Sequence, residues 1–156
     1  MVVMPDIEKR LEAFLRVGHA FIIFPGGAGT VEELLYVLGI LIHPENKQLP
    51  FPLLLTGPAS SEKYFKTLNH FLISTLGDDI QSLYEIIIDE PELVAQHATK
   101  AVSRVRMSRT QSGDAYHFNW MLHIDSDFQK PFFTNHQNMR ELKLDPKMTA
   151  HEITAN

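Results

Sequence analysis

The sequence predicts an α/β protein, a Rossmann-like parallel sheet with flanking helices, of which the C-terminal half of the fold is recognisable. Three short apolar runs, residues 20–24, 51–56 and 84–88, have the length and continuity of buried strands. Segments between and after them place apolar residues at helical spacing. Because strands alternate with helices, we expect parallel pairing with helical crossovers.

The first half of the chain reads as helix, strand, glycine-rich loop and helix. Asp6 is suited to cap a helix over residues 6–17. The run over residues 20–24 predicts a strand covered on both faces, because apolar residues follow one another without alternation. After the glycines, a helical pattern continues to residue 42, where His43 and Pro44 end it.

The second strand is expected to stop at Gly57 and Pro58, and Ser60 or Ser61 to cap the next helix. Gly77 closes this helix, and the third strand leads to a last helix over residues 91–105. The residues expected to face inward from the helix before Gly77 are Tyr64, Phe65, Leu68, Phe71, Leu72 and Leu76.

The character of the sequence changes near residue 106. Residues 106–114 are polar and predict a linker, and residues 116–124 alternate between apolar and polar side chains, which predicts a half-buried strand. We therefore divide the chain into a partial Rossmann-like domain, residues 1–106, and the start of a C-terminal domain or extension, residues 107–156. Since doubly wound sheets generally have five or six strands, we expect the sequence to be a piece of a longer protein.

Composition argues against several classes of protein. The formal net charge is −5 and the 14 Lys and Arg are scattered, which disfavours nucleic acid as a partner. No cysteine is present, so we expect a reducing compartment, the cytoplasm. The longest apolar run, residues 34–42, is too short to span a membrane. The eight histidines show no metal-ligand spacing, so we expect no metal site.

The stretch PGGAGTVEE, residues 25–33, joins the first strand to the second helix. It matches neither the dinucleotide fingerprint, which needs a glycine where Glu32 stands, nor a Walker loop. It does combine flexible backbone with a helix N-terminus, whose outward amides carry partial positive charge. This combination favours binding of a phosphate group.

The two carboxylates in this stretch have competing explanations. Thr30 and Glu33 match a capping box, in which the glutamate serves only the helix. Glu32 is most simply a first-turn residue stabilised by the helix dipole. A phosphate and a catalytic carboxylate would repel each other at one spot, so both could serve a phosphorylated sugar only at different ends. At the sugar end of such a ligand, the carboxylate would stabilise positive charge at the anomeric carbon.

PGGAGTVEE resembles the PGGxGTxxE signature of the Lonely Guy family of phosphoribohydrolases, and Arg10 lies where that family carries an upstream arginine. The likeness extends through MPDIEKRLEAF, LLLTGP and DAYHFNW, and so over nearly the whole chain. Because Leu11 rather than lysine follows Arg10, the resemblance favours the bacterial nucleosidase branch over cytokinin-type members.

The resemblance implies hydrolysis of the N-glycosidic bond of a nucleoside 5′-monophosphate of the AMP, GMP, CMP and UMP class, without a cofactor. The implied catalytic residues are Arg10 and Glu33, with Glu32 as an accessory residue. The implied phosphate-binding residues are Gly26, Gly27, Gly29 and Thr30. A homo-oligomer and regulation by an alarmone are also implied. A lysine decarboxylase label carried by some relatives is set aside, because neither Lys9 nor Lys47 lies in a pyridoxal phosphate motif.

Alternatives remain open at this point. Arg10 also fits a solvated position on an amphipathic helix. The family's first strands and an earlier glycine-rich segment have no counterpart in this sequence. The chain could therefore be a non-catalytic nucleotide-binding or regulatory module, or an inactive fragment of the enzyme.

Overall fold

The computed structural model describes residues 3–143, 145 and 147–154. The strands are β1 (Phe21–Ile23), β2 (Leu53–Gly57) and β3 (Glu85–Ile88). The α-helices are α1 (Ile7–Val17), α2 (Ala28–Ile42), α3 (Glu62–Leu76), α4 (Pro91–Ser112), α5 (His136–Glu141) and α6 (Ala150–Thr154). Short 3-10 helices are η1 (Pro44–Asn46), η2 (Ala59–Ser61), η3 (Asp78–Leu83) and η4 (Ser126–Gln129). Within these described residues, none of the helices combines the length and the apolar character that crossing a bilayer requires.

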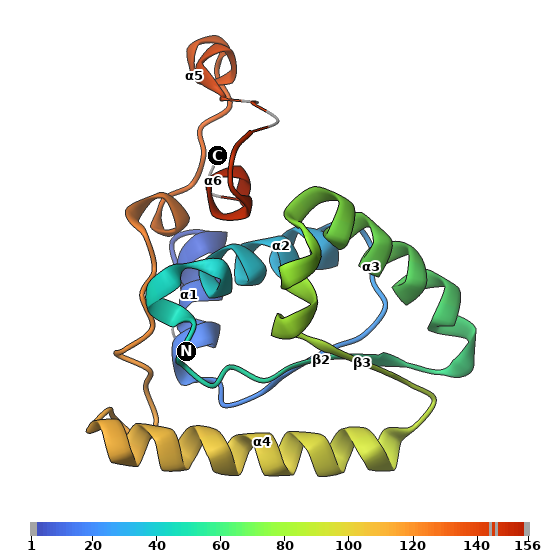
Figure 1. The fold of residues 1–156 in the computed structure, drawn as a ribbon. Coiled ribbons are helices and arrows are strands. Elements are labelled where there is room, and N and C mark those ends of the chain that lie inside the picture. Colours follow the sequence, from blue (N-terminus) through green and yellow to red (C-terminus); the bar gives the residue numbers. More distant parts are fainter. Residues whose placement is uncertain (1–2, 144, 146, 155–156) are drawn as a thin grey trace.

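The three strands form one parallel sheet in the order β1-β2-β3, with a helix in each connection. Figure 1 shows the layers: α4 runs along one face of the sheet, and α1, α2 and α3 lie on the other. All five residues of the central strand β2 are buried. The predicted α/β, Rossmann-like architecture with a parallel sheet is confirmed.

The main core lies between the sheet and helices α2 and α3. Its most completely buried side chains include Leu38 from α2, Leu55 from β2 and Phe65 from α3. A smaller cluster of Leu54, Ile87 and Val94 lies on the opposite face of the sheet, under α4. Alternate residues of β2 therefore feed two separate cores, as strand geometry requires.

The prediction that the first strand is covered on both faces is wrong. Ile22 pairs in register with Leu54, so the two side chains point to the same face of the sheet. Leu54 is buried under α4, whereas Ile22 is 42% exposed and Phe24, just after the strand, is 61% exposed. The reason is that β1 is an edge strand of the described sheet and α4 packs over β2 and β3.

Helix α3 follows its prediction except at its start and on one face. Ser61 occupies the N-cap position, yet its hydroxyl donates to the carbonyl of Pro58 at 2.6 Å, so the predicted cap bond is not formed. Phe71 is exposed, whereas Phe65, Leu68, Leu72 and Leu76 are buried and Tyr64 is half-buried. Gly77 ends the helix at φ 88°, a backbone angle that favours glycine.

The predicted linker over residues 106–114 is wrong, because α4 continues to Ser112 and ends at Gly113. Val105 at the expected end and Arg109 beyond it keep the inner face of the helix buried. The guanidinium of Arg109 donates to the carbonyls of Gly18 and Tyr116, at 3.1 and 3.3 Å. The polar sequence thus belongs to a helix that Arg109 holds against other segments. The division of the chain near residue 106 stays a prediction.

Residues 116–124 form turns and irregular backbone, so the predicted half-buried strand is wrong. Two side chains from other elements form hydrogen bonds with backbone groups that, in a strand, would pair with a neighbouring strand. Arg16 donates to the carbonyls of Asn119 and Leu122, at 2.9 and 3.0 Å, and Asn46 bonds both backbone groups of His123. This segment leads to η4, which contacts α1, while α6 packs against α2 and α3.

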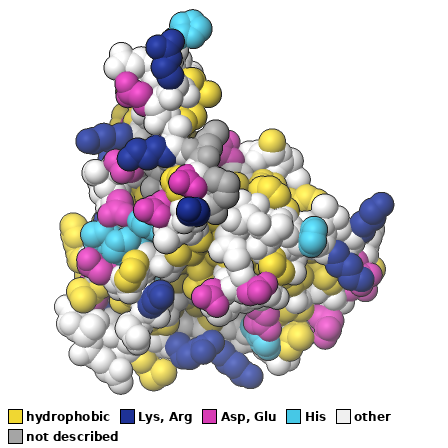
Figure 2. Space-filling view, turned by 45° about the horizontal axis from the view of Figure 1, so that its top comes forward, with side chains coloured by type: hydrophobic (Ala, Val, Ile, Leu, Met, Phe, Trp, Pro, Cys, Tyr) yellow, Lys and Arg dark blue, Asp and Glu magenta, His cyan; other side chains and the backbone are white. Residues whose placement is uncertain are grey.

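The surface carries mixed charges. Figure 2 shows Lys and Arg side chains scattered among Asp and Glu over one face of the molecule. This distribution agrees with the scattered basic residues of the sequence.

Candidate active site

Helix α1 brings Arg10 toward the start of α2. Asp6 caps α1 by accepting a hydrogen bond from the amide of Lys9 at 2.8 Å, as predicted. Leu11 and Leu15 bury the inner face of the helix, and the side chain of Arg10 remains 48% exposed. The position of Arg10 is therefore fixed by a capped helix packed on the core.

The glycine-rich loop runs directly from β1 into α2. Gly27 is the N-cap residue, and no side chain caps this end of the helix. A Cβ atom on residue 26 would overlap the side chain of Thr30, so only glycine fits there without a shift. At Gly27 and Gly29 a Cβ would meet nothing within 4 Å, so open space lies in front of both.

The capping-box explanation of Glu33 is wrong. Helix α2 begins at Ala28, and Thr30 lies inside its first turn rather than at its N-cap. Glu33 therefore lies too far along the helix to bond the N-cap amide. The first turn holds no acidic residue, so the expected first-turn position of Glu32 is also wrong.

Arg10 and Glu33 meet across the interface between α1 and α2. Nη2 of Arg10 donates to Oε1 of Glu33 at 2.9 Å, although the two residues are 23 positions apart in the sequence. Both side chains are partly exposed, so the pair contributes only about 0–1 kcal/mol to stability. Together with Thr30, Glu33 also lines a largely apolar cavity of about 350 Å³ between α1, β1 and α2.

Other charged side chains of α1 form hydrogen bonds with one another. Glu12 accepts from Lys9 at 2.8 Å and from Arg16 at 2.9 Å. Partial burial raises the pKa of Glu12, but hydrogen bonds from Lys9 and Arg16 outweigh it and leave that pKa below its usual value. Glu12 thus belongs to a network on its own helix, and Arg10 faces Glu33.

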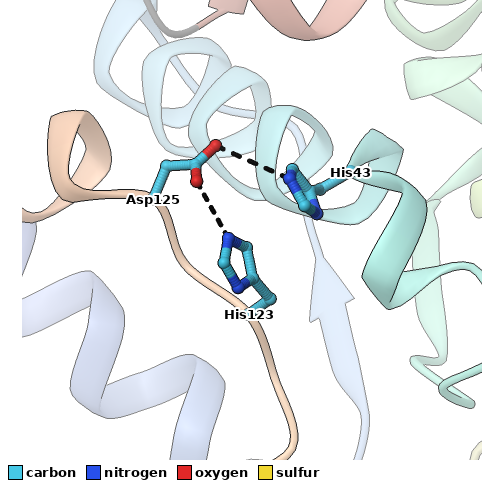
Figure 3. A group of neighbouring side chains, drawn as sticks. All are labelled: His43, His123 and Asp125. Atoms are coloured by element: carbon cyan, nitrogen blue, oxygen red, sulfur yellow. Dashed lines mark hydrogen bonds and ion pairs between the residues drawn. The ribbon is translucent and has the colours of Figure 1, made fainter.

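A second group of side chains was missed by the sequence reasoning. His43, His123 and Asp125 lie together where the end of α2 meets the segment before η4 (Figure 3). His43 and His123 are 80 positions apart, so no local spacing could have revealed the group. Only the fold brings them together.

Two protein-family models match successive parts of the chain. The family model described as "Possible lysine decarboxylase", which represents the Lonely Guy-like domain, matches residues 1–98. The chain belongs to this family. A second model, described as "Pyrimidine/purine nucleotide monophosphate nucleosidase, C-terminal", matches residues 102–156.

Curated relatives of this Lonely Guy-like chain carry a nucleosidase name. Proteins called "Pyrimidine/purine nucleotide 5′-monophosphate nucleosidase" from Escherichia coli strains K12, O6:H1 and O157:H7 are each 49% identical to it over 156 residues. The alignment covers all of the chain and 34% of each relative. The chain therefore spans about a third of the length of the curated relatives it matches.

Of the predicted site residues, the structure joins Arg10 to Glu33 and places four others in the adjoining turn. Gly26, Gly27, Gly29 and Thr30 lie in the loop and first turn of α2, and Glu32 is exposed on the same helix. The roles of all these residues stay predictions.

Proposed function

We propose that the protein hydrolyses the N-glycosidic bond of nucleoside 5′-monophosphates, releasing a free base and ribose 5-phosphate. The observation that carries this proposal is the Arg10–Glu33 pair beside the glycine turn at the N-terminus of α2. The name of the Escherichia coli relatives supports the same reaction.

The start of α2 suits the 5′-phosphate. Its first amides point out of the helix with partial positive charge, and no acidic side chain lies in the first turn to repel an anion. The open space at Gly27 and Gly29 lets a phosphate approach the backbone closely. The hydroxyl of Thr30, which lies over Gly26, adds a donor at the same end.

Glu33 suits the sugar because it stands away from the phosphate position. It lies six positions after Gly27, which is about 9 Å along the helix axis. As the bond between C1′ and the base breaks, the bonding electrons leave with the base and positive charge develops on the ribose. The Glu33 carboxylate would stabilise that charge and accept a proton from the attacking water, whose oxygen bonds to C1′.

Arg10 suits the departing base. Its guanidinium stays charged and presents several donors in one plane, so that one can hold Glu33 while another contacts the substrate. A proton must reach the base as it leaves, and a nearby cation would stabilise the negative charge that builds up before this transfer.

The direct test is to incubate the full-length protein with AMP, GMP, CMP and UMP and to measure ribose 5-phosphate. We expect release from the wild type, and a loss of about 10- to 100-fold in kcat/KM for Arg10→Ala, the range for a lost charged hydrogen bond. Arg104→Ala, an exposed arginine on α4, is the matched control and should keep full activity.

Absence of ribose 5-phosphate with all four nucleotides would refute the nucleosidase proposal. Calorimetry that shows nucleotide binding without turnover would instead support the second function, a non-catalytic nucleotide-binding or regulatory module.

Gly26→Ala should raise KM for the nucleotide by about tenfold or more, because the new methyl group must displace Thr30 from the phosphate end of the site. Steady-state kinetics with AMP measure this change. The comparison variant is Gly113→Asn at the end of α4, where φ is 74° and asparagine tolerates the left-handed backbone. Equal KM values for wild type and Gly26→Ala would contradict a role of this turn in phosphate binding.

We also propose that the protein works as a homo-oligomer, and that an alarmone is its regulator, as the family resemblance implies. Exposed apolar side chains on α1, Phe14 and Val17, and in and just after β1, Ile22 and Phe24, support association with further protein surface.

A further inference from the structure

A compact group of potential metal ligands lies outside the proposed active site. It consists of His43 at the end of α2, and of His123 and Asp125 in the segment before η4 (Figure 3). Nε2 of His123 lies 2.9 Å from Oδ1 of Asp125, and Nε2 of His43 lies 3.9 Å from Oδ2 of the same carboxylate. One ligand atom from each residue lies within 4.8 Å of the others.

The fold holds this group in place through a buried asparagine. Asn46 is 2% exposed, and its side chain accepts from the amide of His123 and donates to the carbonyl of the same residue, both at 2.8 Å. It also donates to the carbonyl of Ile40 near the end of α2, at 2.8 Å. The backbone of His123 is thereby fixed against the helix that carries His43, so the two histidines lie side by side before any ion arrives.

Further contacts resemble the outer shell of known metal sites. Nδ1 of His123 faces Oε2 of Glu45 at 3.5 Å, which orients the ring so that Nε2 points to Asp125. The second oxygen of Asp125 is bonded to Nε2 of His151 from α6, at 2.8 Å. Metal-bound histidines and carboxylates are held in this way by neighbouring carboxylates and donors.

The ligand spacing is close to that of a zinc site, but the two imidazole rings must turn to bind one ion, because they stack with centroids 4.2 Å apart and planes 23° apart. Around a tetrahedral zinc ion with bonds near 2.0–2.1 Å, ligand atoms lie about 3.4 Å apart. The separations of 2.9 and 3.9 Å from the two histidines lie on either side of that value, and they run to different oxygens of Asp125, so the carboxylate must also turn to present one oxygen to the ion. The side chains of His43, His123 and Asp125 are 18%, 35% and 32% exposed, so an ion can reach them from solvent.

We propose that His43, His123 and Asp125 bind one divalent transition-metal ion of the Zn²⁺ class, with water completing the coordination. Imidazole and carboxylate ligands without thiolate suit such ions. The ion would tie the irregular segment around residue 123 to the end of α2, and through His151 would also hold α6. When Nε2 of His43 binds the ion, the ring proton lies on Nδ1. Nδ1 then no longer accepts the hydrogen bond from the Glu45 amide, which is 3.3 Å long.

The test is calorimetric titration of the metal-free, full-length protein with ZnCl₂, together with thermal unfolding in Zn²⁺ and in EDTA. We expect one ion per chain and, at a hundredfold excess over Kd, a rise in Tm of roughly 5–10 °C. Asp125→Asn and His123→Gln should each weaken binding by at least about 100-fold. His70→Gln, an exposed histidine on α3, is the matched control and should bind Zn²⁺ like the wild type.

Circular dichroism of each variant without metal separates lost ligands from lost folding, and His43→Gln serves as a further ligand variant if one of the others does not fold. Equal Zn²⁺ affinity in Asp125→Asn and in the wild type would overturn the proposal. So would the absence of binding heat and of a Tm shift in the wild type at millimolar Zn²⁺.

Discussion

Replacing Glu33 by glutamine should lower kcat for release of ribose 5-phosphate by about 10²–10⁴-fold, the range for removal of a positioned general base or of a charge-stabilising group. The amide keeps the size of the side chain and can still accept a hydrogen bond from Arg10, so nucleotide binding should persist. It cannot accept the proton from water or carry the negative charge that stabilises the developing sugar cation. Single-turnover kinetics with AMP separate this loss from a change in affinity.

The matched control is Glu92→Gln, which removes the same charge from an exposed position of α4, outside the proposed site. Thermal unfolding should show nearly the same Tm for both variants and the wild type, because Glu33 forms no helix cap and its ion pair is partly exposed. Full activity in Glu33→Gln would eliminate the proposed catalytic role, as would an equal loss in Glu92→Gln.

The largest loss of stability is expected from Asn46→Ala. Its side chain is buried and makes three hydrogen bonds to backbone groups of Ile40 and His123. Alanine leaves the amide and carbonyl of His123 without these partners, at a cost of about 1–3 kcal/mol for each unsatisfied group. We expect the free energy of unfolding to fall by about 2–5 kcal/mol and Tm by roughly 5–15 °C.

Urea unfolding and thermal scans measure this effect, and hydrogen exchange at the His123 amide should become faster in Asn46→Ala. Gln48→Ala changes an exposed amide two residues away and should leave stability within about 0.5 kcal/mol of the wild type. If both variants unfolded like the wild type, Asn46 would not hold the segment around residue 123 to the core.

Local patterns were sufficient for the sheet and the helices that pack on it. The apolar runs at residues 20–24 and 84–88 contain β1 and β3, and the run at 51–56 contains all of β2 except Gly57. Asp6 and Gly77 mark helix ends where capping chemistry predicted them. These features depend on a few adjacent residues and on burial, so they are readable without knowledge of the rest of the fold.

The C-terminal third was predicted poorly for a physical reason. Alternation in residues 116–124 predicted a strand, yet Arg16 and Asn46 take up the backbone groups of that segment. A strand needs a neighbouring ladder, and hydrogen bonds from distant side chains replaced it. The polar residues after position 105 likewise stayed helical, because the buried Arg109 donates to carbonyl groups of other segments.

The sequence by itself determined the parallel α/β architecture, the glycine turn before α2 and the candidacy of Arg10 and Glu33, because each depends on local periodicity or on a contiguous motif. Only the tertiary structure decided that Glu33 pairs with Arg10 instead of capping its helix, since the start of α2 at Ala28 moved the N-cap away from Thr30. It alone also brought His43 to His123 and Asp125. Such contacts depend on how separate elements pack, and residues far apart in a chain carry no shared local pattern that would reveal them.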